Sequence, residues 1–266
     1  VEIREAGPLA GGMLRFGIPA YRLPRDVLDR EVARIVAAGV TLTLNHKVED
    51  VLKARDEGGF DAVFMASGAH LAKRVDIPAR EAGKILDAVS FLEQASLAEE
   101  QGLPPPKLGR RVAIYGGGNT AMDCCRTSRR LGGQEVKVVV RSGFEEMKAS
   151  PWEKEDAMHE GIPILNFMVP KSYVHENGKL TGMTFEKVKA VYDDKKRRQL
   201  VSTGEPDELI ACDDVLVAIG QENAFPWIER DIGLDFDRHG MPVLEALTLQ
   251  STLPRVFFGG DAALGP

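Results

Sequence analysis

The sequence has 266 residues and a mass of 29.1 kDa, which is enough for two domains of ordinary size. Hydrophobic residues make up 44% and charged residues 28%, as is typical of a soluble globular protein. The net charge of -6 argues against nucleic acid as the main partner, because phosphate binding depends on clustered Lys and Arg. Apolar runs are only strand-sized, so no membrane insertion is expected.

The cysteine pattern excludes several kinds of redox and metal chemistry. Cys124, Cys125 and Cys212 form no C-x-x-C pair and no set of metal ligands. We therefore expect no metal site in this chain, no disulfide reductase activity and a reducing, cytoplasmic setting. Cys124 and Cys125 are interpreted as small apolar packing residues on a helix.

The first five residues, VEIRE, form a predicted strand that ends at Glu5. In a dinucleotide-binding domain, an acidic residue at the end of the second strand accepts hydrogen bonds from the ribose hydroxyls. Glu5 is therefore a candidate ligand, and an exposed terminal glutamate is the alternative. Because no strand, glycine turn and helix precede it, we expect the chain to begin within a larger fold.

Residues 7–24 contain four glycines and three prolines, so we expect an ordered loop without regular secondary structure. Helical spacing then predicts a helix over 24–38, and a strand follows over 40–44. A further apolar strand runs from Val63 to Gly68, where the absence of a Cβ would let the backbone approach a cofactor.

Residues 80–107 read as a connector that contains a helix over 87–101. The three prolines at 104–106 predict a semi-rigid domain boundary immediately after it.

A strand, a glycine-rich turn and a helix follow in the stretch 110–131, RRVAIYGGGNTAMDCCRTSRRL. Gly116, Gly118 and Ala121 occupy the three small-residue positions of the G-x-G-x-x-G/A fingerprint. The first permits a tight turn, the second a close approach to a pyrophosphate, and the third close packing of the helix on the sheet. The predicted binding turn comprises Gly116, Gly117, Gly118, Asn119, Thr120 and Ala121.

The next strand, 135–140, ends at Arg141, which decides the nucleotide preference. An arginine at this position pairs with a 2′-phosphate, whereas an acidic residue would accept the ribose hydroxyls, so NADP(H) is predicted. Arg129, Arg130 and Lys148 are candidates for a second positive charge. Asp123 is predicted in the first turn of the helix, where it complements the dipole or contacts the nicotinamide or ribose.

The remaining chain is mostly predicted strand. Ser150 to Glu153 form a capping box that begins a helix over 151–160. A strand over 162–170 is followed by a hairpin that turns at 176–178. Lysines and arginines between 187 and 198 suggest a solvated hairpin tip, with docking of an acidic partner as the alternative.

Two later strands end in glycine. The stretch 214–220, DVLVAIG, ends at Gly220, and the stretch 256–261, VFFGGD, ends at Gly260 and Asp261. Such strand-end glycines suit close approach of a cofactor. The stretch 251–261 resembles a signature of FAD enzymes in which a threonine leads an apolar strand that ends in Gly-Asp, and Ser251 stands at the position of that threonine.

Four segments together resemble the small (beta) subunit of NADPH-dependent glutamate synthase: GGMLRFGIPAYRLP, GGGNTAMD, VAIGQ and the terminal GGD. The resemblance covers essentially the whole chain. It implies that the first segment passes near the FAD isoalloxazine and that Asp261 binds the FAD ribityl or pyrophosphate. The flavin-contacting candidates that it adds are Gly11, Gly12, Met13 and Leu14. The family commonly has two arginines where this chain has Arg141 followed by serine.

The resemblance also implies an α/β architecture with two Rossmann-type dinucleotide-binding domains. The NADP domain, predicted over 107–222, is inserted into an incomplete FAD domain formed by 1–106 and 223–266. The FAD helix that would follow Asp261 is expected to be missing.

The implied activity is that of an NADPH-dependent flavin oxidoreductase. Hydride would pass from NADPH to FAD, so no side chain is predicted to be catalytic. Electrons would leave through iron-sulfur clusters or a larger oxidoreductase subunit. The alternatives are the electron-input subunit of a formate dehydrogenase or aromatic-degradation reductase, and a non-catalytic NADP-binding sensor or scaffold.

Overall fold

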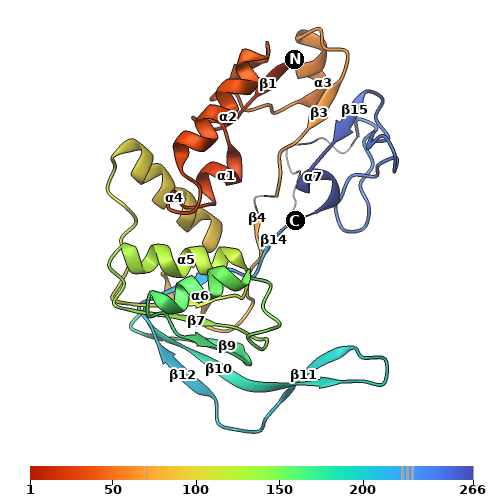
Figure 1. The fold of residues 1–266 in the computed structure, drawn as a ribbon. Coiled ribbons are helices and arrows are strands. Elements are labelled where there is room, and N and C mark those ends of the chain that lie inside the picture. The colour runs from red at the N-terminus through yellow and green to blue at the C-terminus, as the bar shows by residue number, and fades with distance from the viewer. Residues whose placement is uncertain (70, 223–224, 226–227, 229–230, 266) are drawn as a thin grey trace. The chain divides into compact units, whose positions relative to one another are not determined.

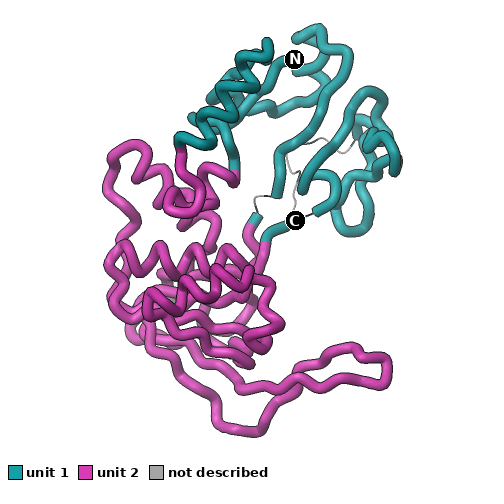
Figure 2. The backbone as a smooth tube through the Cα atoms, in the orientation of Figure 1, with its two compact units in different colours: residues 1–12, 26–71, 221–266 teal, residues 13–25, 72–220 magenta. Residues whose placement is uncertain are grey.

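The computed structural model describes residues 1–69, 71–222, 225, 228 and 231–265 (Figure 1). The chain forms two compact units (Figure 2). Unit 1 consists of residues 1–12, 26–71 and 221–266, and unit 2 consists of residues 13–25 and 72–220. The main stretch of unit 2 therefore lies, along the chain, between two stretches of unit 1.

Unit 2 is built on a five-stranded parallel sheet with the strand order β5-β13-β6-β7-β8. The strands are β5 (Ile85–Asp87), β13 (Asp214–Val217), β6 (Arg111–Tyr115), β7 (Glu135–Val139) and β8 (Ile164–Leu165). The strand order reverses beside β6, because β7 follows it directly whereas β13 comes from the end of the unit. In open α/β sheets, ligands bind at the carboxyl ends of the strands at such a reversal.

The longer helices of unit 2 are α4 (Ala88–Gln101), α5 (Asn119–Arg130) and α6 (Pro151–His159). Helix α4 begins where Asp87 accepts a hydrogen bond from the Ser90 N–H at 2.8 Å, and it ends at Gly102 in the left-handed conformation. The predictions of helices over 87–101 and after Ser150 are thus confirmed. Figure 1 shows α5 and α6 on one face of the sheet.

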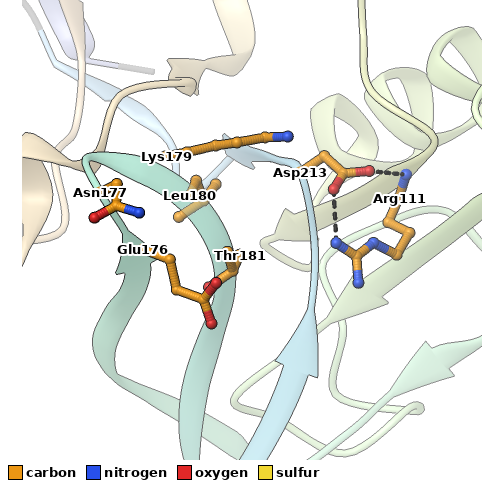
Figure 3. Close-up of a pocket in the computed structure, with 7 residues that line it drawn as sticks. All are labelled: Arg111, Glu176, Asn177, Lys179, Leu180, Thr181 and Asp213. Carbon is orange, nitrogen blue, oxygen red and sulfur yellow. Dashed lines mark hydrogen bonds and ion pairs between the residues drawn. The ribbon is translucent and has the colours of Figure 1, made fainter.

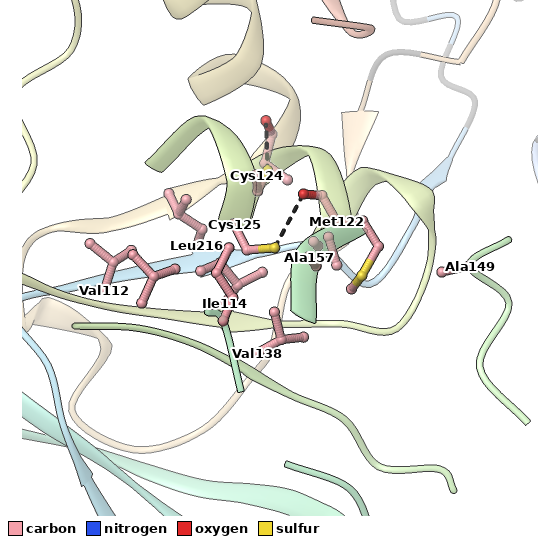
Figure 4. Packing of buried hydrophobic residues seen from close by; sticks show 14 of the residues in the cluster. Val112, Ile114, Met122, Cys124, Cys125, Val138, Ala149, Ala157 and Leu216 are labelled. Carbon is pink, nitrogen blue, oxygen red and sulfur yellow. Dashed lines mark hydrogen bonds between the residues drawn. The ribbon is translucent and has the colours of Figure 1, made fainter. Parts of the chain in front are cut away.

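Helix α5 packs on the parallel sheet through a buried face whose side chains, apart from Met122, are small (Figure 4). Met122, Cys124 and Cys125 are fully buried against residues from three strands, namely Val112, Ile114, Val138 and Leu216. The Cys124 thiol donates to the Ala88 carbonyl at 3.8 Å, and the Cys125 thiol donates to the Met122 carbonyl at 3.2 Å. The interpretation of these cysteines as packing residues is confirmed.

An antiparallel sheet packs on the other face of the parallel one. Its strands are β9 (Met168–Glu176), β10 (Lys179–Tyr192), β11 (Arg198–Ser202) and β12 (Glu208–Ala211). Strand β10 pairs with all three others. The predicted hairpin turns at Asn177 and Gly178, with φ values of 52° and 75° that suit a type I′ turn. The β10–β11 turn, where Asp193 binds Arg197 at 2.7 Å, is an exposed hairpin tip as expected.

Unit 1 contains two parallel strand pairs, β1 with β2 and β3 with β15. Its elements are β1 (Glu2–Arg4), α2 (Arg25–Ala37), β2 (Thr41–Thr43), α3 (Val51–Glu57), β3 (Val63–Met65), β15 (Val256–Phe258) and α7 (Asp261–Leu264). A buried cluster that includes Met65, Leu234 and Phe258 fills its core. The remaining short elements are β4 (Leu71–Ala72), the 3-10 helix Arg80–Ala82 and β14 (Gln221–Glu222).

The structure corrects three local expectations. The segment 7–24 is not wholly irregular, since Gly12–Phe16 forms helix α1 between glycines at both ends. The strand predicted over 162–170 is divided into β8 and β9 at Phe167, whose φ of 58° breaks the extended backbone. A helix does follow the terminal Gly-Asp pair, because α7 begins at Asp261.

The compact units also divide the chain differently from the predicted domain ranges. Residues 72–106 lie in unit 2, where β5 pairs with β13 and α4 contributes Phe91 and Leu92 to the core beneath α5. Residues 13–25 lie in unit 2 as well. The three prolines therefore lie within unit 2 and do not mark the boundary between the units.

Candidate nucleotide-binding site

The glycine turn lies at the carboxyl end of β6, beside the reversal of strand order. Gly116 has a φ of 152°, and a Cβ on it would lie 2.1 Å from the Ala218 carbonyl oxygen at the end of β13. The Gly116 N–H also donates to the Val139 carbonyl at 3.0 Å. A glycine is thus required here both for the tight turn and for close packing of the neighbouring strand ends.

The next two glycines differ in their surroundings. A Cβ on Gly117 would lie 2.7 Å from Val140 Cγ1, so this residue is packed against the end of β7. A Cβ on Gly118 would meet no atom within 4 Å. Open space beside Gly118 is what close approach of a pyrophosphate to the backbone requires.

Helix α5 begins directly after Gly118, and no side chain caps its first N–H groups. Ala121 is fully buried, as the third position of the fingerprint predicts, and Thr120 lies between it and Asn119 in the first turn. A helix start of this kind, next to a glycine with free space above it, fits the diphosphate of a dinucleotide.

Asn119 has a partner that the sequence did not reveal. Its Oδ1 accepts a hydrogen bond from the Ser150 N–H at 2.8 Å, while its Nδ2 donates to Ser150 Oγ at 3.4 Å. The reciprocal capping box predicted between Ser150 and Glu153 is therefore not formed, since the Ser150 side chain makes no capping hydrogen bond. The two hydrogen bonds between Asn119 and Ser150 thus connect the start of α5 to the start of α6.

Arg141 is exposed at the end of β7 and makes no hydrogen bond or ion pair with the described residues. It is therefore available to an anion. Arg129 and Arg130 do not supply a second charge here. Arg129 Nη1 donates to the Gly133 carbonyl at 3.1 Å, and Arg130 Nη2 lies 2.6 Å from Glu160 Oε1, both at the far end of α5.

Asp123 is in the second turn of α5 rather than the first, and its carboxylate points to protein. Arg22 Nη1 donates to Asp123 Oδ1 at 2.9 Å and to Oδ2 at 2.7 Å. Burial raises the pKa of Asp123 to about 6, although Arg22 opposes the shift. The pKa of Arg22 is also raised, because Asp123 and Glu153 together outweigh the cost of its partial burial. The Asp123 side chain is more buried than that of Arg22, so burial has the larger effect on the pKa of Asp123.

Sequence reasoning missed the ion pairs that bind the glycine- and proline-rich segment to the helices of unit 2. Arg22 Nε lies 2.6 Å from Glu153 Oε1 on α6, while Arg15 Nη1 lies 3.0 Å from Glu100 Oε2 on α4. Arg25 Nε lies 3.0 Å from the other Glu100 oxygen. The presence of three arginines within eleven residues could have indicated ion pairs, but nothing in the sequence identified the carboxylates that they bind.

The remaining predicted cofactor residues are spread over several elements. Gly220 has a φ of 107° and follows β13 in unit 2. Met13 and Leu14 lie on α1, and Leu14 is 51% exposed. In unit 1, Gly68 has a φ of 71° after β3.

Three further predicted positions of unit 1 have special backbones. Gly11 and Gly12 have φ values of 124° and 49°, and Gly260, at 61°, precedes α7 and Asp261. A Cβ on Gly12 or Gly260 would meet no atom within 4 Å. Glu5 lies at the end of β1, where its Oε1 accepts a hydrogen bond from the Gly7 N–H at 2.6 Å.

A pocket of about 450 Å³ lies at the opposite, amino-terminal end of the parallel sheet (Figure 3). Arg111, at the start of β6, donates to Asp213 at 2.7 Å within it. Because the fingerprint and Arg141 are at the carboxyl ends of the strands, this pocket is separate from the candidate site. The described residues contain no cluster of metal-ligating side chains and no helix long and apolar enough to cross a membrane.

Several known proteins are similar to this chain in sequence. The NADP(+)-dependent formate dehydrogenase subunit beta of Moorella thermoacetica is 38% identical over 270 residues, which are 100% of this chain and 37% of that protein. The glutamate synthase (NADPH) small chain of Escherichia coli K12 is 29% identical over 271 residues, which are 97% of this chain and 57% of that protein. The chain thus spans only part of the length of these relatives.

The fold has counterparts among solved structures. FprA from Mycobacterium tuberculosis matches with a TM-score of 0.79 at 19% identity, covering 100% of this chain and 72% of that one. The predicted α/β fold class and the resemblance to the glutamate synthase small subunit are confirmed. The profile of the pyridine nucleotide-disulphide oxidoreductase family matches residues 22–266, so the chain belongs to that family.

Proposed function

We propose that this chain is the NADP(H)- and FAD-binding part of an oxidoreductase that takes electrons from NADPH. The observation that carries the proposal is the glycine turn of unit 2. Gly116 packs so closely on Ala218 that no Cβ would fit between them, whereas a Cβ on Gly118, at the start of α5, would meet no atom within 4 Å. This combination fits a dinucleotide diphosphate bound at the strand-order reversal.

The preference for NADP(H) is assigned to Arg141. Its guanidinium stands exposed at the end of β7 without a protein partner among the described residues. A 2′-phosphate, which NAD(H) lacks, offers it a charge-assisted and bidentate contact.

The flavin is assigned to residues that were predicted from the sequence, and the open space beside two glycines of unit 1 supports this assignment. Gly260 precedes α7 with open space where a Cβ would stand, and Gly12 has the same property. Glu5, Gly11, Gly68 and Asp261 complete the set in unit 1, and Met13 and Leu14 are added from α1. When bound, NADPH supplies a hydride and FAD accepts it.

The electrons are proposed to leave through an iron-sulfur domain or a larger partner subunit. Cys124, Cys125 and Cys212 are all buried without disulfides, so none of them is placed to accept electrons from a flavin. The relative from Moorella thermoacetica is named as a subunit of a larger enzyme. Its name favours the formate dehydrogenase type of system as the second candidate.

The full-length protein tests this function. We expect flavin absorbance that NADPH bleaches under anaerobic conditions, and an Arg141→Ala variant with a much higher dissociation constant for NADPH than wild type. The matched control is Arg110→Ala, because Arg110 is 69% exposed at the amino end of β6. A colourless protein that still binds NADPH would support the sensor alternative, and equal effects of Arg141→Ala on NADPH and NADH would contradict the 2′-phosphate assignment.

A further inference from the structure

The loop that joins β7 to α6, residues 140–150, is packed against the glycine turn at both of its ends. Where the loop leaves β7, Val140 Cγ1 would lie 2.7 Å from a Cβ on Gly117. Where it returns, Met147 Cγ would lie 3.5 Å from the same position. The Ala149 N–H donates to the Gly117 carbonyl at 3.0 Å. Val140, Met147 and Ala149 are all buried, so the loop has a fixed position beside the turn.

Two basic residues of this loop are direct neighbours of residues that touch Gly117. Arg141 follows Val140, and Lys148 lies between Met147 and Ala149. Consecutive Cα atoms are about 3.8 Å apart, so both basic side chains start close to the turn. Both residues are exposed, and neither makes a hydrogen bond or ion pair with the described residues.

Two other cations that contact this loop already have partners within it. Arg198 Nη1 lies 2.8 Å from Glu146 Oε2, and Lys154 Nζ donates to the Phe144 carbonyl at 2.9 Å. The Tyr192 hydroxyl, 2.7 Å from Glu146 Oε1, keeps the pKa of that carboxyl below its usual range. Glu145 is the one other carboxylate between residues 140 and 150, and it is exposed.

We propose that Lys148 is a second selectivity residue, which together with Arg141 binds the 2′-phosphate of NADP(H). The proposal rests on the function proposed above. A phosphate monoester carries a charge of about -1.5 to -2 near neutral pH, so a single arginine leaves part of that charge unpaired. Lys148, as a compact donor on a flexible stem, supplies the missing charge from the other end of the same loop.

The test uses the full-length protein and compares two probes that differ only in the 2′-phosphate. Dissociation constants for 2′,5′-ADP and 5′-AMP are measured by calorimetry for wild type, Lys148→Ala, Lys148→Arg and Lys107→Ala. Lys107 is the matched control, because it is an exposed lysine that precedes the amino end of β6, whereas the candidate site lies at the carboxyl end. The melting temperature of each variant is measured in parallel.

We expect Lys148→Ala to raise the dissociation constant of 2′,5′-ADP about 5- to 20-fold and to leave that of 5′-AMP within about twofold. Lys148→Arg should retain most of the affinity, and Lys107→Ala should match wild type. Equal effects of Lys148→Ala on both probes, or no effect on either, would overturn the role of Lys148 while nucleotide binding itself persists. A wild-type protein that binds neither probe would overturn the proposed function together with this inference.

Discussion

Arg22 Nη1 lies 2.7 Å from Asp123 Oδ2, and Nε of the same guanidinium lies 2.6 Å from Glu153 Oε1. One arginine of the 13–25 segment therefore binds a carboxylate on α5 and another on α6. Both carboxylate side chains are only 5% exposed, so their charges depend on this cation for compensation. The contact connects the segment to the helix that begins at the candidate nucleotide site.

Arg22→Ala is expected to destabilise the protein by about 2 to 4 kcal/mol, because two enclosed carboxylates would lose their shared partner. Arg126, 3.1 Å from Glu153, offsets part of the loss. The free energy of unfolding from urea titration measures the effect. Arg30→Ala serves as the control, since Arg30 and its partner Asp26 are more than 60% exposed and such pairs contribute little. If both variants lost the same free energy of unfolding, the burial of the Arg22 ion pairs would not explain their contribution to stability.

The stability of the protein should depend on the ionisation of Asp123. Burial raises the pKa of Asp123 to about 6 in the folded state, against about 3.9 in the unfolded chain. The folded state then binds the proton more tightly, so the contribution of Asp123 to stability falls as pH rises from about 4 to about 6.

Asp123→Asn removes this titration. The free energy of unfolding of the variant, relative to wild type, should therefore rise with pH across the same window and stay constant above it. Urea titrations at several pH values measure the difference. The opposite slope would mean that Arg22 outweighs burial and lowers the pKa of Asp123.

Two alanine substitutions in the glycine turn should have different consequences. Gly118→Ala adds a methyl group where no atom lies within 4 Å and φ is -99°, so the melting temperature should stay close to that of wild type. The methyl group would occupy the space assigned to the diphosphate, and the dissociation constant for NADPH should rise at least about tenfold.

Gly116→Ala should instead lower the melting temperature, because its Cβ would collide with the Ala218 carbonyl at 2.1 Å. The two variants are compared by calorimetry and NADPH titration. A Gly118→Ala protein with unchanged NADPH affinity would place the diphosphate elsewhere.

The three cysteines should be unreactive in the native protein. Burial raises the pKa of Cys125 and of Cys212 to about 12, and it also raises that of Cys124. Native protein treated with iodoacetamide at pH 8 should therefore yield unmodified peptides for all three positions by mass spectrometry. Protein alkylated in denaturant provides the positive control. Rapid native alkylation of Cys124 or Cys125 would contradict the packing of α5.

The strand-turn-helix around Gly116 was predictable because its signals are local. An apolar run that is followed by small residues at fixed spacing can be recognised within this stretch alone, without knowing which distant segments it contacts. The hairpin at Asn177 and Gly178 was predictable for the same reason. An adjacent asparagine and glycine favour such a turn because both tolerate the positive φ that they have in the structure.

Contacts between distant segments were not predictable. Glu153 has the position of a capping-box residue, yet in the fold it binds Arg22 and Arg126, while Asn119 contacts the Ser150 backbone instead. The boundary predicted at the prolines differs from the compact units because β5 gains its partner, β13, from more than a hundred residues away. Pairing at such separations leaves no signature in either segment alone.

The ion pairs of Arg15, Arg22 and Arg25 have a practical consequence for dissecting the protein. A fragment cut at residues 72 and 220 would contain Glu100 and Asp123 without the arginines that bind them, and Glu153 with Arg126 but without Arg22. Expressing such a fragment alone would therefore yield poorly folded material, however well its sheet is preserved. A peptide spanning residues 12–25, supplied in trans or fused through a linker, would be needed to complete the domain.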